Sequence, residues 1–337
     1  MTLNDVAHDA GVSYQTVSRV VNKHPSVAGP TRERVLASIE KLDYRPNQLA
    51  RGLVTRRSYT IGIVAIGAAF YGPAQMIVNI DRSLSQRGYG LTMTTIREFT
   101  YENVRAAIQE LKSRAVDGLV MIAPIQASVL GHAKELFGQT PFVLVDAEPG
   151  SSAPSILIDQ REGGRLATQH LVDLGHRRIA EIHGPLAWND ARLRHEAWCS
   201  TLAKAGLEAG PTYEGDWTAS SGYQGMTKIL AQHPKFTGLV VGNDQMALGA
   251  LHRLREAGLA APEDISVVGF DDIPESGYFD PPLTTVRQDF TALGKRSADY
   301  LIALIDDPRA ATPQEMLKPS LVLRGSTRRT GDGDGPR

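Results

Sequence analysis

Several side chains that can bind hydroxyl groups stand directly after apolar segments of the chain. Asp146, Asn243 and Asp271 are examples. Planar Asp, Asn, Gln and Arg groups can each bridge two neighbouring hydroxyls, and an aromatic ring can stack on the apolar C–H face of a sugar ring. The candidate set is Asp146, Arg194, Trp217, Asn243, Asp271 and Gln288. Its chemistry favours a neutral sugar, although any one member could have a structural role, such as the capping of a turn by Asp271.

A second set of residues with recognition chemistry lies near the N-terminus. Tyr14, Gln15 and Thr16 are followed one helical turn later by Ser18 and Arg19. Gln can pair with adenine, and Arg can donate two hydrogen bonds to guanine O6 and N7 in the DNA major groove. A solvated polar helix face is the alternative for any single residue. The helices expected around these residues favour the DNA-reading interpretation.

These N-terminal residues fall in a pattern of short helices. Thr2 can cap a first helix in a capping-box variant with Asp5, and Gly11 supplies a turn. Ser13 then caps a second helix over residues 14–22, with its valines on one stripe. Two short helices joined by a Gly-containing turn are typical of the helix-turn-helix motif, in which the start of the second helix enters the major groove.

A third helix and the charge balance support this prediction. Pro30 stands in the first turn of that helix. The side chains expected to point inward are Val35, Leu36, Ile39 and Leu42. Residues 1–57 carry nine Lys/Arg against five Asp/Glu, whereas the remaining 280 residues carry 27 against 32. A basic head on a mildly acidic body indicates that only the head meets a polyanion.

Residues 46–58 are expected to link the head to the body. Asn47 can cap a short helix here, but Gly52 weakens it, and two turns of helix are marginal alone in water. Leu49 and Leu53 would form one apolar edge beside arginines, which suits insertion into the DNA minor groove. The alternative is a linker that packs against its own body.

From residue 59 onward, apolar strand candidates alternate with amphipathic helices. The predicted strands span 60–65, 90–95, 118–123, 142–146, 156–158, 178–183, 238–242 and 265–270. The predicted helices include 73–87, 102–114, 162–174, 192–205 and 244–257. Continuous apolar strands indicate an α/β fold in which helices cover both faces of a parallel sheet. The interruption at 149–154 favours two open, doubly wound lobes over one closed barrel, with ligands beyond the carboxyl ends of the strands.

Composition excludes several classes of protein and site. One cysteine among 337 residues, Cys199, cannot form an internal disulfide or a cysteine metal cluster, and no metal site is expected. The chain has no P-loop and no GxGxxG motif after a strand, so no nucleotide or other cofactor is predicted. The longest near-apolar run, 61–72, is too short to span a bilayer, and no signal peptide is visible. With the basic head, this predicts a cytoplasmic, nucleoid-associated protein.

Five motifs resemble the LacI/GalR family of bacterial transcription regulators, the lac-type members most closely, and the likeness spans almost the whole chain. They are GVSYQTVSRVVN in the head, GDW at 215–217, NDQMALGA at 243–250, DISVVG at 264–269 and PPLTT at 281–285. The resemblance implies a helix-turn-helix head (1–45) and a hinge helix (46–58) on a two-lobed, doubly wound parallel-sheet core of periplasmic-binding-protein type (59–324). A disordered tail (325–337) is expected to follow.

The resemblance also assigns roles to individual residues. The residues expected to contact DNA are Ser13, Tyr14, Gln15, Thr16, Ser18, Arg19, Asn22 and Leu53, the last as a minor-groove wedge. The residues expected to line the sugar pocket are Phe70, Pro73, Met76, Asp146, Trp188, Asp190, Arg194, Trp217, Asn243, Asp271, Gln288 and Phe290. The segment 187–190 departs from the family's hydroxyl-rich pattern by adding bulk and a carboxylate, and 70–72 also differs. These departures bear on which sugar is bound.

The family implies a repressor rather than an enzyme. Its two heads read a palindromic operator in double-stranded DNA, and a small-molecule sugar releases it, with a galactoside or other β-linked sugar preferred. The polar, Gly-rich tail lacks leucine heptads, which predicts a homodimer without a C-terminal tetramerisation helix. Two alternatives are a sugar-active enzyme that uses Asp146 and Asp271 as an acid/base pair, and a plain sugar-binding protein with an accessory DNA-binding head.

Overall fold

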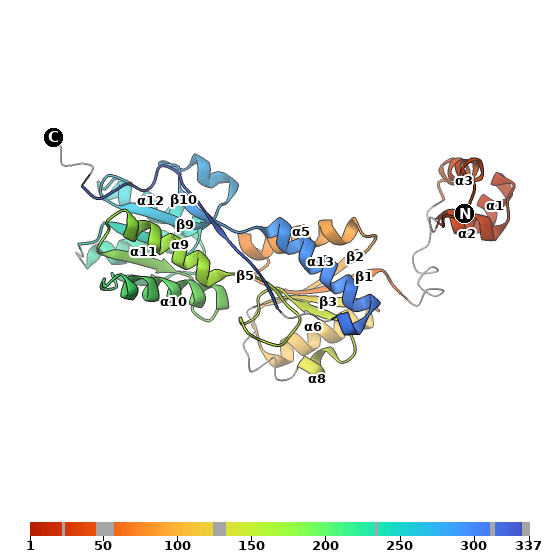
Figure 1. Cartoon of the computed structure of the whole chain (residues 1–337), viewed down its shortest axis with the longest axis horizontal. Helices are drawn as coiled ribbons and strands as arrows, with labels where there is room; N and C mark the ends of the chain where they lie inside the picture. Colours follow the sequence, from red (N-terminus) through yellow and green to blue (C-terminus); the bar gives the residue numbers. More distant parts are fainter. Residues whose placement is uncertain (22–23, 45–56, 124–132, 233–234, 311–313, 332–337) are drawn as a thin grey trace. The chain divides into compact units, whose positions relative to one another are not determined.

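The chain forms two structural units, Met1–Tyr59 and Thr60–Arg337, each with its own hydrophobic core (Figure 1). The computed structural model describes residues 1–21, 24–44, 57–123, 133–232, 235–310 and 314–331. Most of the predicted hinge, including Leu53, lies outside the described residues, and so does Asn22.

The first unit, the head, is a bundle of three short helices. They are α1 (Leu3–Ala10), α2 (Tyr14–Val21) and α3 (Gly29–Lys41). The predicted capping box is present: the Thr2 N–H donates to the Asp5 carboxylate at 2.7 Å, and the Asp5 N–H donates to Thr2 Oγ1. Gly11 ends α1 at φ 63°, the left-handed conformation that favours glycine. Buried valines from all three helices form the core: Val6 from α1, Val17 and Val20 from α2, and Val35 from α3.

The third helix corrects one prediction. Leu36 is 51% exposed instead of pointing inward. Successive residues of an α-helix are rotated by about 100°, so Leu36 lies off the buried stripe that contains Val35. Ser38, three residues after Val35, is buried in its place, and Ile39 and Leu42 are half-buried beside the core as predicted.

In the second unit, the first lobe is a four-stranded parallel sheet of order β2-β1-β3-β4. Its strands are β1 (Thr60–Ile66), β2 (Gly90–Ile96), β3 (Gly118–Ile122) and β4 (Phe142–Leu144). Its helices are α5 (Tyr71–Ser85), α6 (Tyr101–Ser113), α8 (Ala133–Phe137) and α13 (Phe290–Asp306). Helices α5 and α13 lie side by side on one face, and α6 covers the other (Figure 1). Strands β1 and β3 are almost wholly buried, as continuous apolar strands predict.

The second lobe is a six-stranded sheet of order β12-β10-β9-β8-β6-β7, parallel except for β12. Its strands are β6 (Ile179–His183), β7 (Thr212–Glu214), β8 (Gly238–Val241), β9 (Ser266–Asp271), β10 (Thr284–Arg287) and β12 (Ser320–Val322). Its helices are α9 (Gln160–Asp173), α10 (Asn189–Lys204), α11 (Ala219–Ala231) and α12 (Asp244–Glu256), with a short 3-10 helix, η1 (Pro274–Tyr278). Helices α9 and α10 pack against each other, as do α11 and α12.

Three chain passages join the lobes. These passages follow strand β5 (Ile156–Ile158), strand β10 and strand β11 (Glu315–Leu317). A second 3-10 helix, η2 (Pro308–Ala310), follows α13. Strands β5 and β11 pair with each other in parallel. All eight predicted strands are present, with ends moved by no more than two residues, whereas β7, β10, β11 and β12 are not predicted. Those four strands have only three or four residues each, and β7, β11 and β12 have no buried residue, so they lack the continuous apolar run that marks the predicted strands.

The C-terminal segment corrects the prediction of a tail that is disordered from residue 325. Ser326 is fully buried, its carbonyl accepts from the Val267 N–H at 2.8 Å, and its hydroxyl donates to the Val267 carbonyl. Further along, the Thr330 N–H donates to the Leu174 carbonyl at 2.9 Å. The polar, Gly-rich composition does not reveal that this segment is ordered. Backbone hydrogen bonds hold it in place, and any residue type can form them. Residues 332–337 lie outside the described part.

Candidate functional site

In the head, the predicted DNA-reading side chains project from α2. Those exposed or half-buried on this helix are Tyr14, Gln15, Thr16, Ser18 and Arg19. Ser13 caps the helix, because its Oγ accepts from the Thr16 N–H at 3.2 Å. On the opposite face of α2, Val17 and Val20 are buried in the core of the head. The polar face of α2 is therefore available to a partner.

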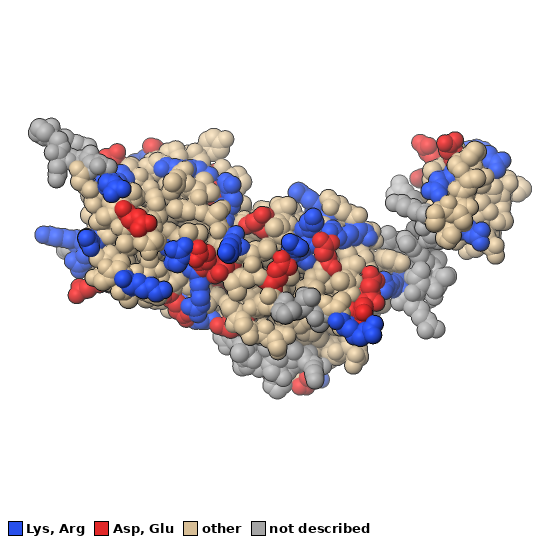
Figure 2. All heavy atoms as spheres, viewed as in Figure 1, with Lys and Arg blue, Asp and Glu red and all other residues tan. Residues whose placement is uncertain are grey.

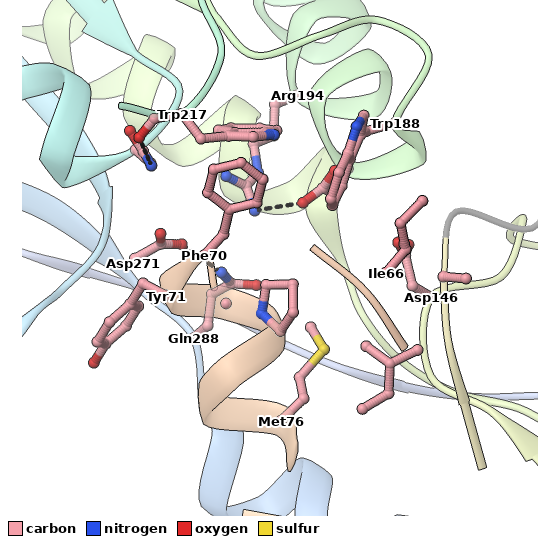
Figure 3. A pocket seen from close by; sticks show the side chains of 16 residues that line it. Ile66, Phe70, Tyr71, Met76, Asp146, Trp188, Arg194, Trp217, Asp271 and Gln288 are labelled. Atoms are coloured by element: carbon pink, nitrogen blue, oxygen red, sulfur yellow. Dashed lines mark hydrogen bonds and ion pairs between the residues drawn. The ribbon is translucent and has the colours of Figure 1, made fainter. Parts of the chain in front are cut away.

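A cavity between the lobes of the second unit gathers most of the residues predicted to bind a ligand (Figure 3). Eleven of the twelve line it: Phe70, Pro73, Met76, Asp146, Trp188, Asp190, Arg194, Trp217, Asn243, Asp271 and Gln288. The first four come from the first lobe, and the others follow strands of the second lobe or belong to α10. This agrees with the rule that open parallel sheets bind ligands beyond the carboxyl ends of their strands.

Phe290 corrects the predicted set, because it does not line this cavity. Asp289 caps α13 by accepting from the Ala292 N–H at 2.8 Å, so the helix begins at Phe290. The Phe290 ring instead packs edge-on against Tyr71, with ring centroids 6.0 Å apart. The sequence argument also missed three lining residues of the first lobe, namely Ile66, Ile122 and Ala123, whereas Tyr71 and Gly72 line the cavity as the segment 70–72 was expected to do. The ends of the predicted strands at 65 and 123 were the signal that could have found most of them.

Arg194 is held from four directions. Its Nε donates to Gln160 Oε1 at 2.9 Å, and its Nη1 donates to the Gly242 carbonyl at 2.6 Å. Its Nη2 lies 3.6 Å from an Asp190 carboxylate oxygen. The guanidinium carbon stands 3.6 Å from the centre of the Phe270 ring. These contacts fix a buried cation at the second-lobe wall of the cavity.

The neighbouring polar groups are positioned by helix and strand ends. Asn243 caps α12, since its Oδ1 accepts from the Met246 N–H at 2.9 Å, and its Nδ2 donates to the Trp217 carbonyl at 3.0 Å. Gln288 Nε2 donates to Asp271 Oδ1 at 2.6 Å. Trp217 and Asp271 both adopt positive φ, 74° and 106°. Backbone strain of this kind is concentrated at functional sites.

Three carboxylates line the cavity, and burial raises the pKa of two of them, Asp146 and Asp271. Burial raises the pKa of Asp271 to about 6, against the opposing effect of Arg194. Burial, reinforced by Asp190, also raises the pKa of Asp146. Behind this wall, burial and the charge of Asp271 raise the pKa of Asp244 to about 8. The cavity therefore holds proton-binding groups that a ligand can influence.

Aromatic side chains enclose the cavity. Trp188 meets Phe70 edge-on at 5.9 Å between ring centroids and Trp217 at 6.2 Å. Two glycines make room for them, because a Cβ on Gly67 would lie 2.4 Å from the Trp188 ring and one on Gly184 would lie 2.2 Å from the Trp217 ring. The Trp217 indole N–H is buried without a hydrogen-bond partner among the described residues. A ligand oxygen can satisfy it.

The free volume of the cavity is about 40 Å³. This admits a few water molecules but not a sugar ring. Trp188 packs against hydrophobic residues of both lobes and is one reason for the small volume. Entry of a larger ligand therefore requires the side chains or the lobes to move apart.

On the visible face of the second unit, no single-sign charged patch stands out among the described residues (Figure 2). Acidic and basic side chains are interspersed over the visible face of the second unit (Figure 2). In the described part of the chain, no helix is long and apolar enough to cross a membrane. The same residues contain no cluster of three or more His, Cys, Asp or Glu side chains suited to a metal ion.

Known proteins resemble this chain in both units. Residues 2–47 match the model of the bacterial regulatory proteins of the lacI family, and residues 168–327 match that of periplasmic binding protein-like domains. The lactose operon repressor of Escherichia coli (strain K12) is 38% identical over 97% of this chain and 91% of that protein. The ribose operon repressor of the same strain is 34% identical over 96% of this chain and 99% of its own length.

A solved structure extends the likeness to three dimensions. The crystal structure of the lac repressor dimer bound to operator and the anti-inducer ONPF matches with a TM-score of 0.87 at 37% identity. The match covers 97% of this chain and 99% of that chain. Both units and nearly the whole sequence are thus accounted for, and the chain belongs to the lacI family of bacterial regulatory proteins.

Proposed function

We propose that this protein is a transcriptional repressor that binds a palindromic operator as a dimer and is released by a sugar, with a galactoside or other β-linked sugar preferred. The observation that carries the proposal is the cavity between the lobes, which carboxylates, amides, an arginine and tryptophans line from both sides. These groups bind hydroxyls and stack on the apolar face of a sugar ring. The relatives named for the lactose and ribose operons support the same reading.

A sugar can release DNA only by favouring one arrangement of the lobes over another. A ligand with equal affinity for both arrangements shifts nothing. Asp146 belongs to the first lobe, whereas Arg194 and Asn243 belong to the second, so a ligand that bridges them senses the angle between the lobes. The hinge, proposed at 46–58 with Leu53 as a minor-groove wedge, joins the first lobe and would respond to that angle.

Dimerisation follows from the DNA-reading geometry that we propose. Two heads, each placing α2 in the major groove, read two half-sites of a palindrome. The known structure that this chain matches is a dimer on its operator. We propose a homodimer without a tetramerisation helix and an operator with lac-type half-sites.

The whole proposal is tested by release of DNA from the full-length protein. A fluorescent duplex with lac-type half-sites is bound, and its anisotropy is followed while sugars are added. We expect tight binding and a fall in anisotropy with a subset of sugars, but none with a non-sugar polyol of similar size. Retention of the duplex at every sugar concentration would count against the sugar response, and failure to bind a selected duplex would count against the repressor.

Replacement of Arg19 by alanine should weaken operator binding by about 1–3 kcal/mol and relax the preference at one base position. Arg19 is exposed on α2, where it can fork onto a guanine. Anisotropy titrations with the operator and single-base variants measure both effects. Arg34→Ala, an exposed arginine on α3, is the matched control and should leave base preference intact. An equal loss on operator and random DNA would identify a phosphate contact instead.

Replacement of Trp188 by alanine should shift preference towards bulky glycosides. The ring fills the cleft against Phe70 and Trp217, so its removal creates space for an aglycone. We expect the affinity for an aryl β-glycoside, relative to the methyl β-glycoside, to rise on the order of tenfold in calorimetry. Leu186→Ala, at an exposed position of the same loop, should leave the ratio unchanged. An unchanged ratio in the Trp188 variant would contradict the placement of the aglycone beside this ring.

The same cavity makes the enzymatic alternative testable. Asp146 and Asp271 share it and both have raised pKa values, as an acid/base pair would. We infer that they bind ligand without chemistry, because an enzyme leaves the head unexplained. Incubation of the protein with β-glycosides at stoichiometric concentration should leave the glycosides intact in chromatography.

A further inference from the structure

The charge of the cavity lining is unbalanced. Its titratable groups are Asp146, Asp190, Asp271, Arg194 and Tyr71. Three of them are carboxylates, and one is a cation. Arg194 forms its ion pair with Asp190 and donates hydrogen bonds to Gln160 and the Gly242 carbonyl. Within the described residues, Asp146 and Asp271 have no salt bridge.

Two of the carboxylates that line the cavity, Asp146 and Asp190, come from opposite lobes. Asp146 follows β4 of the first lobe, and Asp190 lies in the first turn of α10 in the second lobe. Asp190 is close enough to raise the pKa of Asp146, and its contribution exceeds the opposing one of Arg194. No described residue donates a hydrogen bond to the Asp146 carboxylate. Its oxygens are therefore available to a ligand.

The charged side chains around Asp146 and Asp190 do not neutralise the excess of carboxylates in the cavity. Glu148, which also acts on Asp146, is a further carboxylate, and Arg192 is bound to it at 2.7 and 2.9 Å and to Glu196 at 2.9 Å. On the other wall, burial and nearby carboxylates, Asp271 first among them, raise the pKa of Tyr71 to about 12. Carboxyl groups thus line both sides of the cavity, and a bound cation would stabilise their ionised form.

The aromatic side chains that line the cavity also favour a positively charged ligand. Phe70, Trp188 and Trp217 are arranged edge to face, so ring faces as well as edges border the cleft. The face of an aromatic ring carries negative charge density and attracts ammonium groups. A neutral sugar needs one such face for stacking. Three rings together with three carboxylates are better matched to a ligand that also carries positive charge.

We propose that the sugar taken by this cavity carries a protonated amine, so that the effector is an amino sugar of the hexosamine class with its ammonium group between Asp146 and Asp190. The inference rests on the proposed function and makes it specific. The sugar hydroxyls remain for Arg194, Asn243 and the free Trp217 indole N–H. An ammonium group can neutralise the charge of the Asp146 carboxylate, which neither Arg194 nor a neutral hydroxyl neutralises. Sugars with a phosphate or carboxylate are disfavoured by the same carboxylates.

The test compares matched sugars on the full-length protein. Calorimetry at pH 7 measures D-galactosamine against D-galactose and D-glucosamine against D-glucose. N-acetyl-D-galactosamine keeps the nitrogen and removes its charge. We expect an amine to bind at least about tenfold more tightly than its neutral partner, and the N-acetyl sugar to lose that advantage. At pH 5, where more of the carboxylates are protonated, the advantage should shrink.

Variants locate the ammonium site. Asp190→Asn and, as a second variant, Asp146→Asn should each reduce the preference for the amine to within about threefold. Asp280→Asn removes an exposed carboxylate of the same lobe and should keep the preference of the parent protein. Thermal unfolding confirms that each variant is folded before binding is measured.

The outcomes separate this inference from the proposed function. Galactose that binds as tightly as galactosamine and releases the operator would overturn the amine and leave the sugar-responsive repressor standing. Undiminished amine preference in both Asp variants would overturn the assigned position of the ammonium. Failure of every hexose, hexosamine and glycoside to bind would remove the proposed function itself.

Discussion

Arg194→Ala is expected to abolish the response to the effector while operator binding persists. The variant loses the hydrogen bonds to Gln160 and the Gly242 carbonyl and the ion pair to Asp190. Effector affinity should fall by about 10- to 100-fold, because a charge-assisted hydrogen bond to a ligand contributes about 1.5–3 kcal/mol. The head does not contain this residue, so anisotropy with the operator should be normal and should remain high at sugar concentrations that release the parent protein.

The stability of the variant adds a second readout. Removing one partner of a fully buried ion pair costs about 3–5 kcal/mol. The cost here should be smaller, because the Asp190 side chain is 23% exposed, but the buried hydrogen-bond partners of Arg194 also lose their donor. Denaturant unfolding should therefore show a clear loss, and the binding assays are run well below the melting temperature. Arg192→Ala, on the same helix and paired with Glu148 and Glu196 outside the cavity lining, is the control and should still respond to sugar. A normal response in Arg194→Ala would show that the binding site lies elsewhere.

The second large effect concerns Asp244 and pH. Burial raises the pKa of this carboxyl group from 3.8 to about 8. Between these pH values the folded protein keeps a proton that the unfolded chain has released, so the free energy of unfolding falls as pH rises. The contribution lost from pH 4 to pH 8 is about 3–5 kcal/mol. Asp271, whose pKa is raised to about 6, adds to the same trend up to that pH.

Asp244→Asn should remove the Asp244 part of this dependence. Its amide oxygen can accept from the Ile273 N–H, as Asp244 Oδ2 does at 2.9 Å, and its NH₂ group can donate to Thr285 Oγ1, which now lies 2.6 Å from Oδ1. Urea unfolding at pH 5 and pH 8 should show the variant gaining stability over the parent as pH rises. Asp173→Asn, an exposed position, should show no such gain. A parallel pH dependence in parent and Asp244→Asn would contradict the raised pKa.

The sequence by itself determined the features that depend on neighbours along the chain. The capping box of Thr2 and Asp5, the left-handed turn at Gly11 and the cap at Ser13 need only residues within one helical turn. Most of the buried strands were visible because short apolar runs bounded by turn residues and rich in β-branched side chains favour strands over helices. Polar residues directly after such strands lie at the same sheet edge, and Asp146, Asn243 and Asp271 accordingly share one cavity. Several other members of the predicted ligand set that are not at strand ends followed from the family resemblance.

Tertiary structure alone decided what depends on residues distant in sequence. Phe290 faces Tyr71 and not the cavity, and the segment around Ser326 pairs with Val267, because partners more than fifty residues away leave no local pattern. The burial that sets the pKa of Asp244 comes from packing of the whole lobe. Trp188 closes the cavity to about 40 Å³ because hydrophobic residues of both lobes meet around it. The sequence shows that position 188 carries a bulky tryptophan, but only the packing of the two lobes shows which space its ring fills.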